Sequence, residues 1–387
     1  MDNSNKGGST VDQSDPSIRP FRIEIPQNEL DGLRNRLAGT RWPDELPDAG
    51  WRYGVPREHL KELTEYWRTS YDWRKYEAQL NQFPQFTTTI DGANVHFLHV
   101  RSPEKNATPL ILTHGWPGSI VEFLDVIGPL TDPRANGGNS TDAFHLVIPS
   151  IPGYGFSGTT REAGWNVRRI AFAWSVLMKR LGYVAYGAQG GDWGSAISRE
   201  LGGVDPEHVI GVHVNYLPTI PAGDVGNLSE EDKARLARLE LYLAEPAGYM
   251  KIQASRPQTL AYGLTDSPVG QLAWIAEKFN EWIDPACRIE IDRLLTNVMI
   301  YWLTGTAGSS ARLYYESAAY RGQQMPCPVP VGVAVFPHDL VLPVRRLAER
   351  KYKIVHWTEF ERGGHFPAIE APDLIVRDLR TFFRRFR

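Results

Sequence analysis

The stretch GAQGGDWGS, residues 187–195, lies between a predicted strand and a predicted helix. Within it, Gly190-Gly191-Asp192-Trp193-Gly194 fits Gly-x-nucleophile-x-Gly, a sharp turn that exposes a reactive side chain above a sheet. Serine is a common nucleophile in such turns, yet the central residue here is Asp192. The chemistry at this turn must therefore use a carboxylate.

Strands alternate with helices on both sides of this turn, which indicates βαβ units and a mostly parallel sheet. Residues 217–325 break the alternation and are predicted to be mostly helical, with a Ser-x-x-Asp capping box at Ser229. The expected strands lie within 86–90, 94–100, 109–113, 144–149, 183–189, 209–215, 329–337 and 353–360, and the main core helices within 165–181, 194–201, 343–351 and from 373.

The sequence predicts one α/β core that is interrupted by a helical cap and preceded by an extension. Leu30, Leu33 and Leu37 are spaced to share one helix face, and a second helical stretch covers residues 57–80. The expected segments are a disordered tail over 1–20, an N-terminal extension over 21–85, the first part of the core over 86–216, the cap over 217–325 and the second part of the core over 326–387.

The composition is that of an ordinary soluble globular protein. The 387 residues are 42% hydrophobic and carry a formal net charge of -3, so no clustered basic surface for nucleic acid is expected. The only cysteines, Cys287 and Cys327, make no disulfide framework, which favours a reducing, cytoplasmic location. No signal peptide is evident and no apolar stretch approaches roughly 18 residues, so no membrane anchor is expected.

Three loops that follow predicted strands carry Asp192, Asp339 and His365. Their order of nucleophile, acid and histidine is that of the catalytic triad of the α/β-hydrolase fold. Each residue alone is weak evidence, because most acidic residues and histidines lie at the surface or in the core. The joint placement favours a triad, although spacing alone leaves the structural reading open.

The motif HGWPGS, residues 114–119, is a candidate for half of an oxyanion hole. In this fold, one amide comes from the loop after an early strand and the other from the residue after the nucleophile, which nominates Trp116 and Trp193. The Trp116–Pro117 bond is a candidate cis peptide, and the alternative is a tight turn with a packed tryptophan. No cluster has metal-ligand spacing and no phosphate-binding loop occurs, so we expect neither metal nor cofactor.

Several motifs resemble those of epoxide hydrolases of the α/β-hydrolase fold, specifically the microsomal type, and the resemblance covers nearly the whole chain. They are TRWP (40–43), HGWPGS (114–119), PGYGFSG (152–158), GGDWGS (190–195), GYMKIQ (248–253), DSPVG (266–270), EKFNEW (277–282), LLTNVMIYWLTGT (294–306), SSARLYYE (309–316) and RGGHF (362–366).

The resemblance implies an enzyme that converts an epoxide and water to a vicinal diol. It assigns Asp192 as nucleophile, His365 as base and Asp339 as the acid that orients the histidine. It also assigns Tyr249 and Tyr314 as cap tyrosines that hold the epoxide oxygen. Neighbouring residues on a helix point about 100° apart, so only one of Tyr314 and its rival Tyr315 should face the site, and the motif favours Tyr314.

An aspartate suits this reaction because an epoxide offers a saturated carbon and no carbonyl. A carboxylate is ionised at neutral pH and attacks without the help of a base. The resulting ester has a carbonyl that water activated by His365 can hydrolyse, whereas serine would form an ether that the histidine could not cleave.

Two other functions are compatible with parts of the pattern. A haloalkane dehalogenase shares the aspartate, the histidine and the fold but needs N–H donors for a halide. A ligand-binding protein that has lost the chemistry would usually lack a triad member, and all three are present here.

The expected substrate is a small-molecule epoxide, either bulky and apolar or aromatic. This expectation comes from the cap aromatics, for which core packing is the alternative role: Trp274, Phe279, Trp282, Tyr301 and Trp302. The family's habits suggest detoxification or natural-product biosynthesis, and a homo-oligomeric assembly stays open.

Overall fold

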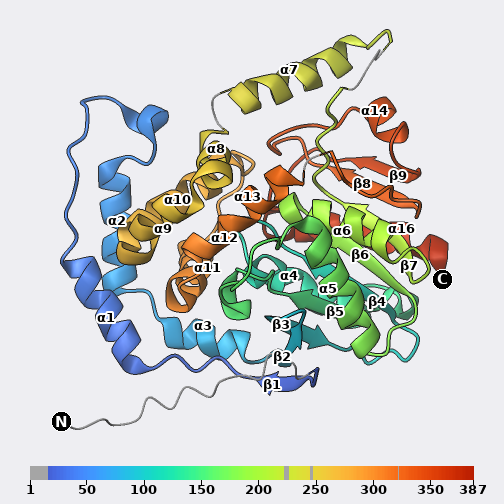
Figure 1. Ribbon diagram of the computed structural model, residues 1–387, viewed down its shortest axis with the longest axis horizontal. Coiled ribbons are helices and arrows are strands. Elements are labelled where there is room, and N and C mark those ends of the chain that lie inside the picture. Colours follow the sequence, from blue (N-terminus) through green and yellow to red (C-terminus); the bar gives the residue numbers. More distant parts are fainter. Residues whose placement is uncertain (1–15, 222–225, 245–246, 321) are drawn as a thin grey trace.

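The apolar runs of the core sequence form one mixed sheet flanked by helices in the computed structural model, which describes residues 16–221, 226–244, 247–320 and 322–387 (Figure 1). The strands are β1 (Arg19–Phe21), β2 (Gln85–Ile90), β3 (Ala93–Val100), β4 (Thr108–Thr113), β5 (Phe144–Pro149), β6 (Tyr186–Gly190), β7 (Val209–Val214), β8 (Val331–Val335) and β9 (Ile354–Glu359). Their order across the sheet is β1-β2-β3-β5-β4-β6-β7-β8-β9. The pairs β1–β2, β2–β3 and β3–β5 are antiparallel and the others are parallel.

The predicted mostly parallel α/β-hydrolase sheet is confirmed, and its strands β4 to β8 are buried because helices cover them, whereas the edge strand β9 is half-buried. The core helices are α4 (Leu124–Thr131), α5 (Val167–Arg180), α6 (Asp192–Val204), α14 (Arg345–Glu349), α15 (Pro367–Glu370) and α16 (Pro372–Phe383). The loops after β4, β6, β8 and β9 all open at the carboxyl edge of the sheet, where open α/β sheets place their sites.

A group of helices between β7 and β8 lies over this edge (Figure 1). It comprises α7 (Glu230–Ala244), α8 (Gly248–Ser255), α9 (Pro257–Asp266), α10 (Pro268–Glu281), α11 (Ile291–Thr304), α12 (Ala307–Ser310) and α13 (Arg312–Ala319). The predicted capping box starts α7, since the Asp232 amide donates to Ser229 Oγ at 3.1 Å. We refer to α7–α13 as the cap.

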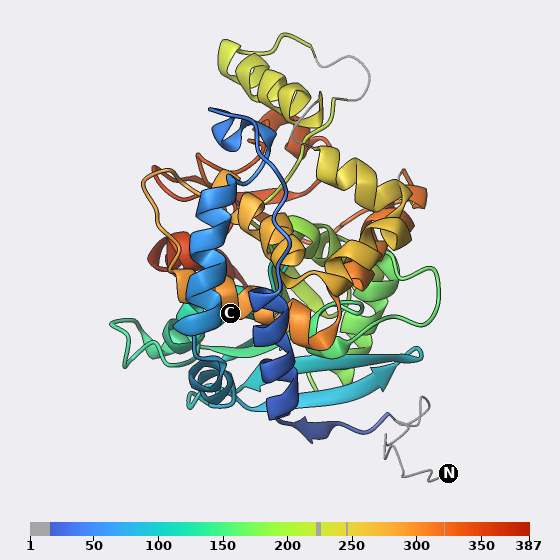
Figure 2. The same cartoon turned by 90° about the vertical axis from the view of Figure 1, so that its left-hand side faces the viewer.

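The N-terminal segment forms α1 (Gln27–Ala38), α2 (Arg57–Thr69) and α3 (Trp73–Leu80), and Figure 2 shows α1 and α2 in front of the cap. Leu30, Leu33 and Leu37 of α1 are buried, as their spacing predicts. The expectation of one helical stretch over 57–80 is wrong. Residues 70–72 interrupt it, because the Asp72 carboxylate accepts a hydrogen bond from the Arg74 amide and so caps a new helix.

The expected disordered tail over 1–20 is also too long. Residues 1–15 lie outside the described part of the chain, but β1 includes Arg19 and pairs with the edge strand β2. The pairing satisfies the backbone hydrogen-bonding groups along the exposed edge of β2. A polar composition alone does not show that this segment forms a strand.

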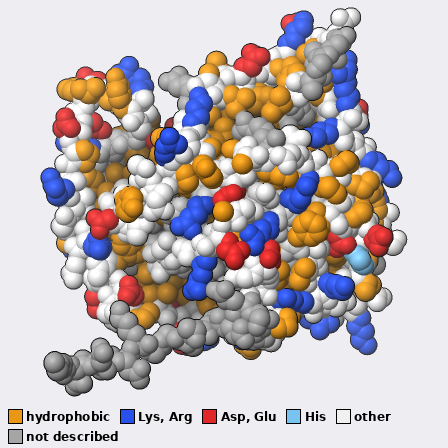
Figure 3. All heavy atoms as spheres, in the orientation of Figure 1, with side chains coloured by type: hydrophobic (Ala, Val, Ile, Leu, Met, Phe, Trp, Pro, Cys, Tyr) orange, Lys and Arg blue, Asp and Glu red, His pale blue; other side chains and the backbone are white. Residues whose placement is uncertain are grey.

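Positive and negative side chains are interspersed on the face shown in Figure 3. Both cysteines are free. Within residues 16–387, apart from the short undescribed gaps, no helix combines the length and apolarity needed to cross a membrane.

The extension is fastened to cap helix α11 through Asp292. The Tyr66 hydroxyl donates to Asp292 Oδ1 at 2.8 Å, and the Tyr76 hydroxyl donates to Asp292 Oδ2. Nearby, the Tyr71 hydroxyl is 2.9 Å from Thr296 Oγ1. One carboxylate thus joins two helices of the extension to the cap.

We predict that Asp292→Ala lowers the free energy of unfolding by about 1.5–3 kcal/mol, because hydrogen bonds to a charged group are lost and two hydroxyls lose their partner. Urea denaturation followed by circular dichroism measures the change. Asp31→Ala is the matched control, since the ion pair of Asp31 with Arg34 is exposed and should contribute little. Equal effects of the two substitutions would contradict this role of Asp292.

Candidate active site

The turn between β6 and α6 holds Asp192 in a conformation that side chains rarely adopt, with φ of 45°. Two glycines of this turn lie so close to neighbouring backbone that neither position has room for a side chain. A Cβ on Gly194 would lie 1.9 Å from the Thr113 carbonyl oxygen, and one on Gly190 would lie 2.2 Å from the Gly194 carbonyl oxygen. The spacing Gly-x-Asp-x-Gly therefore reflects close backbone contacts around a strained residue.

The two oxygens of the Asp192 carboxylate have different surroundings. Oδ1 accepts a hydrogen bond of 2.9 Å from the Trp116 amide, and the Trp116–Pro117 peptide bond is cis, as predicted. Trp193 is the second residue of α6, where helix amides have no partner within the helix. Oδ2 lies 3.4 Å from His365 Nε2, which makes no hydrogen bond of normal geometry.

Asp339 and His365 meet at the same edge of the sheet. Asp339 follows β8, His365 follows β9, and both side chains are buried. His365 Nδ1 is 2.6 Å from Asp339 Oδ1, which also accepts a 2.7 Å hydrogen bond from the Leu340 amide. The three residues selected from chain order therefore lie together, with the imidazole between the two carboxylates.

The charge of His365 depends on those two carboxylates. Burial favours the neutral imidazole, but the charges of Asp339 and Asp192 and the hydrogen bond with Asp339 outweigh it, so that the pKa rises to about 10. His365 is therefore an imidazolium at neutral pH while Asp192 is ionised.

The cap holds the histidine loop directly. The His365 amide donates to the Trp282 carbonyl at 2.8 Å, and the Gly363 amide donates to Asp284 Oδ2 at 2.8 Å. Glu370 accepts from the amides of Asp284 and Phe366 at 2.7 Å and 2.8 Å. The segment between α10 and α11 thus fixes the loop that carries His365.

Tyr249 on α8 and Tyr314 on α13 are both buried above the Asp192 turn. The Tyr249 ring stacks on Trp116 at 5.1 Å, the Tyr314 ring meets Trp193 edge-on at 4.8 Å, and the two tyrosine rings are 6.0 Å apart. Burial raises the pKa of both hydroxyls well above its ordinary value, and the Asp192 charge adds to the effect. Both hydroxyls therefore remain protonated and can donate.

Tyr314 is 3% exposed and Tyr315 is 50% exposed, so the helix directs only Tyr314 inward. The cap aromatics divide into two groups. Trp282 contacts Trp116 and His365, and Trp274 contacts Trp116. The others serve packing: Phe279 stacks on Phe366, Tyr301 donates to the Gly118 carbonyl, and Trp302 lies beneath the Arg36 guanidinium.

Sequence reasoning did not identify two titratable groups near the site. Burial raises the pKa of Glu122 to about 8, although the His365 charge opposes this shift. A Cβ on Gly118 would lie 1.4 Å from Glu122 Oε1, so the HGWPGS glycine makes room for this carboxyl. The second group is Tyr242 on α7, whose hydroxyl is 2.7 Å from that of Tyr249. Neither residue has a motif of its own.

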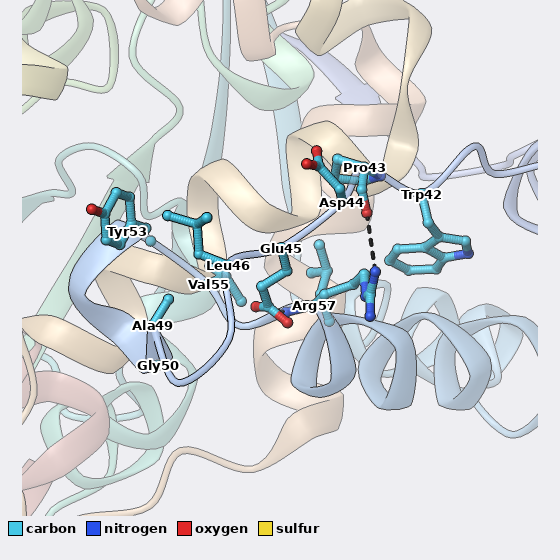
Figure 4. Close-up of a pocket in the computed structure, with 12 residues that line it drawn as sticks. Trp42, Pro43, Asp44, Glu45, Leu46, Ala49, Gly50, Tyr53, Val55 and Arg57 are labelled. Carbon is cyan, nitrogen blue, oxygen red and sulfur yellow. Dashed lines mark hydrogen bonds between the residues drawn. The ribbon is translucent and has the colours of Figure 1, made fainter.

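A separate surface pocket of about 310 Å³ lies in the N-terminal extension (Figure 4). Trp42, Tyr53 and Arg57 line it, and the Arg57 guanidinium donates to the Pro43 carbonyl at 3.4 Å. None of the predicted site residues lines this pocket. In the described ranges, no group of three or more His, Cys, Asp or Glu side chains is placed to hold a metal ion.

Comparison with known proteins assigns the family. Residues 18–123 match the family model "Epoxide hydrolase N terminus", and residues 108–215 match "alpha/beta hydrolase fold". A Stigmatella aurantiaca protein that carries an epoxide hydrolase name is 47% identical over 376 residues, which cover 96% of this chain and 86% of the relative. Epoxide hydrolase 1 of Sus scrofa is 36% identical, covering 97% of this chain and 90% of the relative.

Solved structures agree with these relatives. The structure of Aspergillus niger epoxide hydrolase is similar with a TM-score of 0.87 and 33% identity, covering 97% of this chain and 98% of that one. The fold, the family match of the N-terminal segment and the relatives that cover nearly the whole chain all point to one family. The chain belongs to the epoxide hydrolases of the α/β-hydrolase fold.

Proposed function

We propose that this epoxide hydrolase works through a covalent ester on Asp192, with His365 and Asp339 activating water and with Tyr249 and Tyr314 donating to the epoxide oxygen. The observation that carries the proposal is that His365 Nε2 lies 3.4 Å from Asp192 Oδ2 while two buried tyrosines pack on Trp116 and Trp193 beside that carboxylate. Two of these groups come from core loops and two from the cap.

In the first step, Asp192 Oδ2 attacks an epoxide carbon, because Oδ1 is engaged by the Trp116 amide. A C–O bond forms while the ring C–O bond breaks and its electron pair moves to the ring oxygen. That oxygen takes a proton from a tyrosine, which becomes a phenolate. Buried hydroxyls that stay protonated can act as general acids toward an oxygen that develops negative charge.

In the second step, His365 removes a proton from water and the hydroxide attacks the ester carbonyl. The negative charge develops on Oδ1, beside the amides of Trp116 and Trp193. The diol oxygen leaves with the proton from His365, so that Asp192 becomes a carboxylic acid. Its proton finally passes to His365, which restores the carboxylate and the imidazolium of the resting enzyme and balances the cycle.

The first step prepares the base for the second. A positively charged His365 cannot accept a proton, and its pKa is held at about 10 in part by Asp192. Alkylation turns Asp192 into a neutral ester and removes that support. The pKa of His365 must then fall, so its proton passes to the tyrosine phenolate left by the first step, and the neutral base becomes available only once the ester exists.

The contacts favour a bulky apolar or aromatic epoxide. Trp116, Trp274 and Trp282 surround Tyr249 and the Asp192 turn, and aromatic faces supply apolar contact area. A dehalogenase would need N–H donors where the two tyrosine hydroxyls lie, and the relatives that span the chain carry epoxide hydrolase names. The expected cytoplasmic location and a homo-oligomeric assembly stay predictions.

The covalent route predicts the origin of the diol oxygen. In a single turnover of styrene oxide in heavy-oxygen water, the new diol oxygen should come from Asp192, and the label should appear in the peptide that contains Asp192. His365→Gln should form the ester and fail to hydrolyse it, visible as a mass adduct on that peptide. Direct labelling of the diol in the first turnover would exclude the ester.

Tyr314 and Tyr315 form a matched pair for testing the acid. Tyr314→Phe should slow ester formation about 100-fold, since loss of one hydrogen-bond donor to an oxygen that develops negative charge typically costs this much. Tyr315→Phe should change the rate less than twofold, because its side chain is half exposed. Rapid-quench measurement of ester formation provides the comparison, and equal losses in the two variants would refute the assignment.

The dependence of the His365 charge on Asp192 can be measured without turnover. Asp192→Asn leaves a neutral group in place of the carboxylate, as the ester does, and should lower the pKa of His365 below the wild-type value. NMR titration of labelled histidine, assigned with His365→Gln, reports it. In the wild type, the hydrolysis rate should rise with pH as the imidazolium of the ester intermediate loses its proton.

The groups that surround His365 set the controls for this titration. They are Asp192, Asp339, Glu122, Tyr216 and Glu370. Glu122→Gln removes the carboxyl group whose pKa is about 8. In this variant the rate of ester hydrolysis should still rise with pH. A pKa of His365 that is unchanged in Asp192→Asn would show that the ester does not release the base.

A further inference from the structure

The two cap tyrosines differ in what surrounds them. The Tyr249 hydroxyl is 2.7 Å from the Tyr242 hydroxyl of α7, and the Lys278 ammonium lies 5.1 Å from the centre of the Tyr249 ring. The Tyr314 hydroxyl is buried and makes no hydrogen bond of normal geometry within the described chain. Tyr249 therefore has a hydroxyl partner at its oxygen and a cation at its ring face, and Tyr314 has neither among the described residues.

We propose that Tyr242 is a positioning residue that makes Tyr249, rather than Tyr314, the tyrosine that gives its proton to the epoxide oxygen. This inference rests on the proposed function, in which both cap tyrosines donate to that oxygen. It adds a division of roles, with Tyr249 as the proton donor and Tyr314 as a hydrogen-bond donor that keeps its proton.

The direction of the Tyr242–Tyr249 hydrogen bond follows from proton count. A tyrosine hydroxyl has one proton to donate and can also accept. When the Tyr249 proton is directed to an epoxide oxygen, only Tyr242 can donate in the pair. Substrate binding thus orients the pair as Tyr242 O–H to Tyr249 oxygen, and Tyr249 O–H to substrate.

This hydrogen bond strengthens as the reaction proceeds. As the epoxide C–O bond breaks, the Tyr249 proton moves to the alkoxide and negative charge collects on the Tyr249 oxygen. Hydrogen bonds to an ionised acceptor are roughly twice as strong as neutral ones. An interaction that is stronger in the transition state than in the ground state accelerates the step. The Lys278 ammonium adds little to this effect, because it is paired with Glu277 and, at 3.1 Å, with Glu281.

Helix α7 is held in the position that this role requires. Its inward residues Arg235, Arg238, Leu239 and Tyr242 follow the spacing of one helix face. Arg235 pairs with Glu359 at 2.7 Å, and Arg238 donates to the carbonyls of Pro337, at 3.0 Å, and of Asp339.

The outward side of α7 gains little from burial, since Leu241 is 76% exposed. The contacts of α7 with the body of the protein thus run from the loop of the catalytic acid to the hydroxyl of Tyr249.

Double-mutant cycles test the assignment. We expect Tyr242→Phe to slow ester formation from styrene oxide roughly tenfold, the equivalent of about 1.4 kcal/mol for one strengthened hydrogen bond, and to leave ester hydrolysis unchanged. In a Tyr249→Phe background, Tyr242→Phe should cause no further loss. In a Tyr314→Phe background, the two losses should multiply. Tyr262→Phe, at an exposed position of α9, is the matched control.

A Tyr242 replacement that keeps the hydroxyl but changes its acidity distinguishes loss of the hydrogen bond from a disturbance of packing. Replacement of Tyr242 by 3-fluorotyrosine keeps the hydroxyl and strengthens it as a donor, so ester formation should not slow at pH 7. An unchanged rate in Tyr242→Phe, an equal loss in the Tyr249→Phe background, or a loss confined to hydrolysis would overturn the inference.

The proposed function is tested separately by the wild-type protein. Wild-type protein that forms no diol from styrene oxide or 1,2-epoxyhexane would remove the proposed function and this inference together. If the wild-type protein is active and Tyr242→Phe leaves the rate of ester formation unchanged, only this inference is refuted.

Discussion

The position of the Asp192 carboxylate is the constraint on which the surrounding structure depends. A residue at φ of 45° at the end of β6 must be held there, and close contacts between the Asp192 turn and the β4 loop hold it. The same loop supplies the Trp116 amide that engages Oδ1. The strain at Asp192 and the hydrogen bond at its oxygen are thus two results of one close contact between neighbouring parallel strands.

The cap is part of the catalytic geometry as well as its cover. Its segment after α10 accepts the His365 amide at the Trp282 carbonyl, and Asp284 holds Gly363. At its other end, Arg238 of α7 donates to the carbonyl of Asp339. A displacement of the cap would therefore move Asp339 and His365 together with Tyr249 and Tyr314. In the proposed mechanism, these hydrogen bonds couple the binding of substrate to the geometry of the catalytic residues.

The sequence was most informative where chemistry imposes a pattern. Alternating strands and helices predicted the sheet, and the glycines around Asp192 predicted its turn, because each pattern follows from backbone geometry. The break of the 57–80 helix was missed since Asp72 acts through a local cap that competes with helix periodicity. Arg19 and Pro20 were assigned to the tail because their partners in β2 are far away in the sequence.

Residues that act through tertiary contact had no pattern to reveal them. Tyr242 lies beside Leu241 and Leu243 in an ordinary helical run, and only the fold places its hydroxyl against Tyr249. Glu122 is an ordinary acidic residue until the Gly118 turn encloses it. Tyr249 and Tyr314 were found only through family motifs, because they come from two cap helices whose meeting point depends on the packing of α8 against α13.

In the proposed mechanism, the charges at the site explain why one carboxylate serves both half-reactions. Asp192, enclosed by Trp116, Trp193 and the cap tyrosines, attracts the imidazolium of His365 more strongly than it would in water. While Asp192 is ionised, His365 keeps its proton and cannot activate water prematurely. Once the carboxylate has become an ester, the attraction ends and the proton is released. The negative charge that performs the attack thus also controls when the base can act, which a neutral serine could not do.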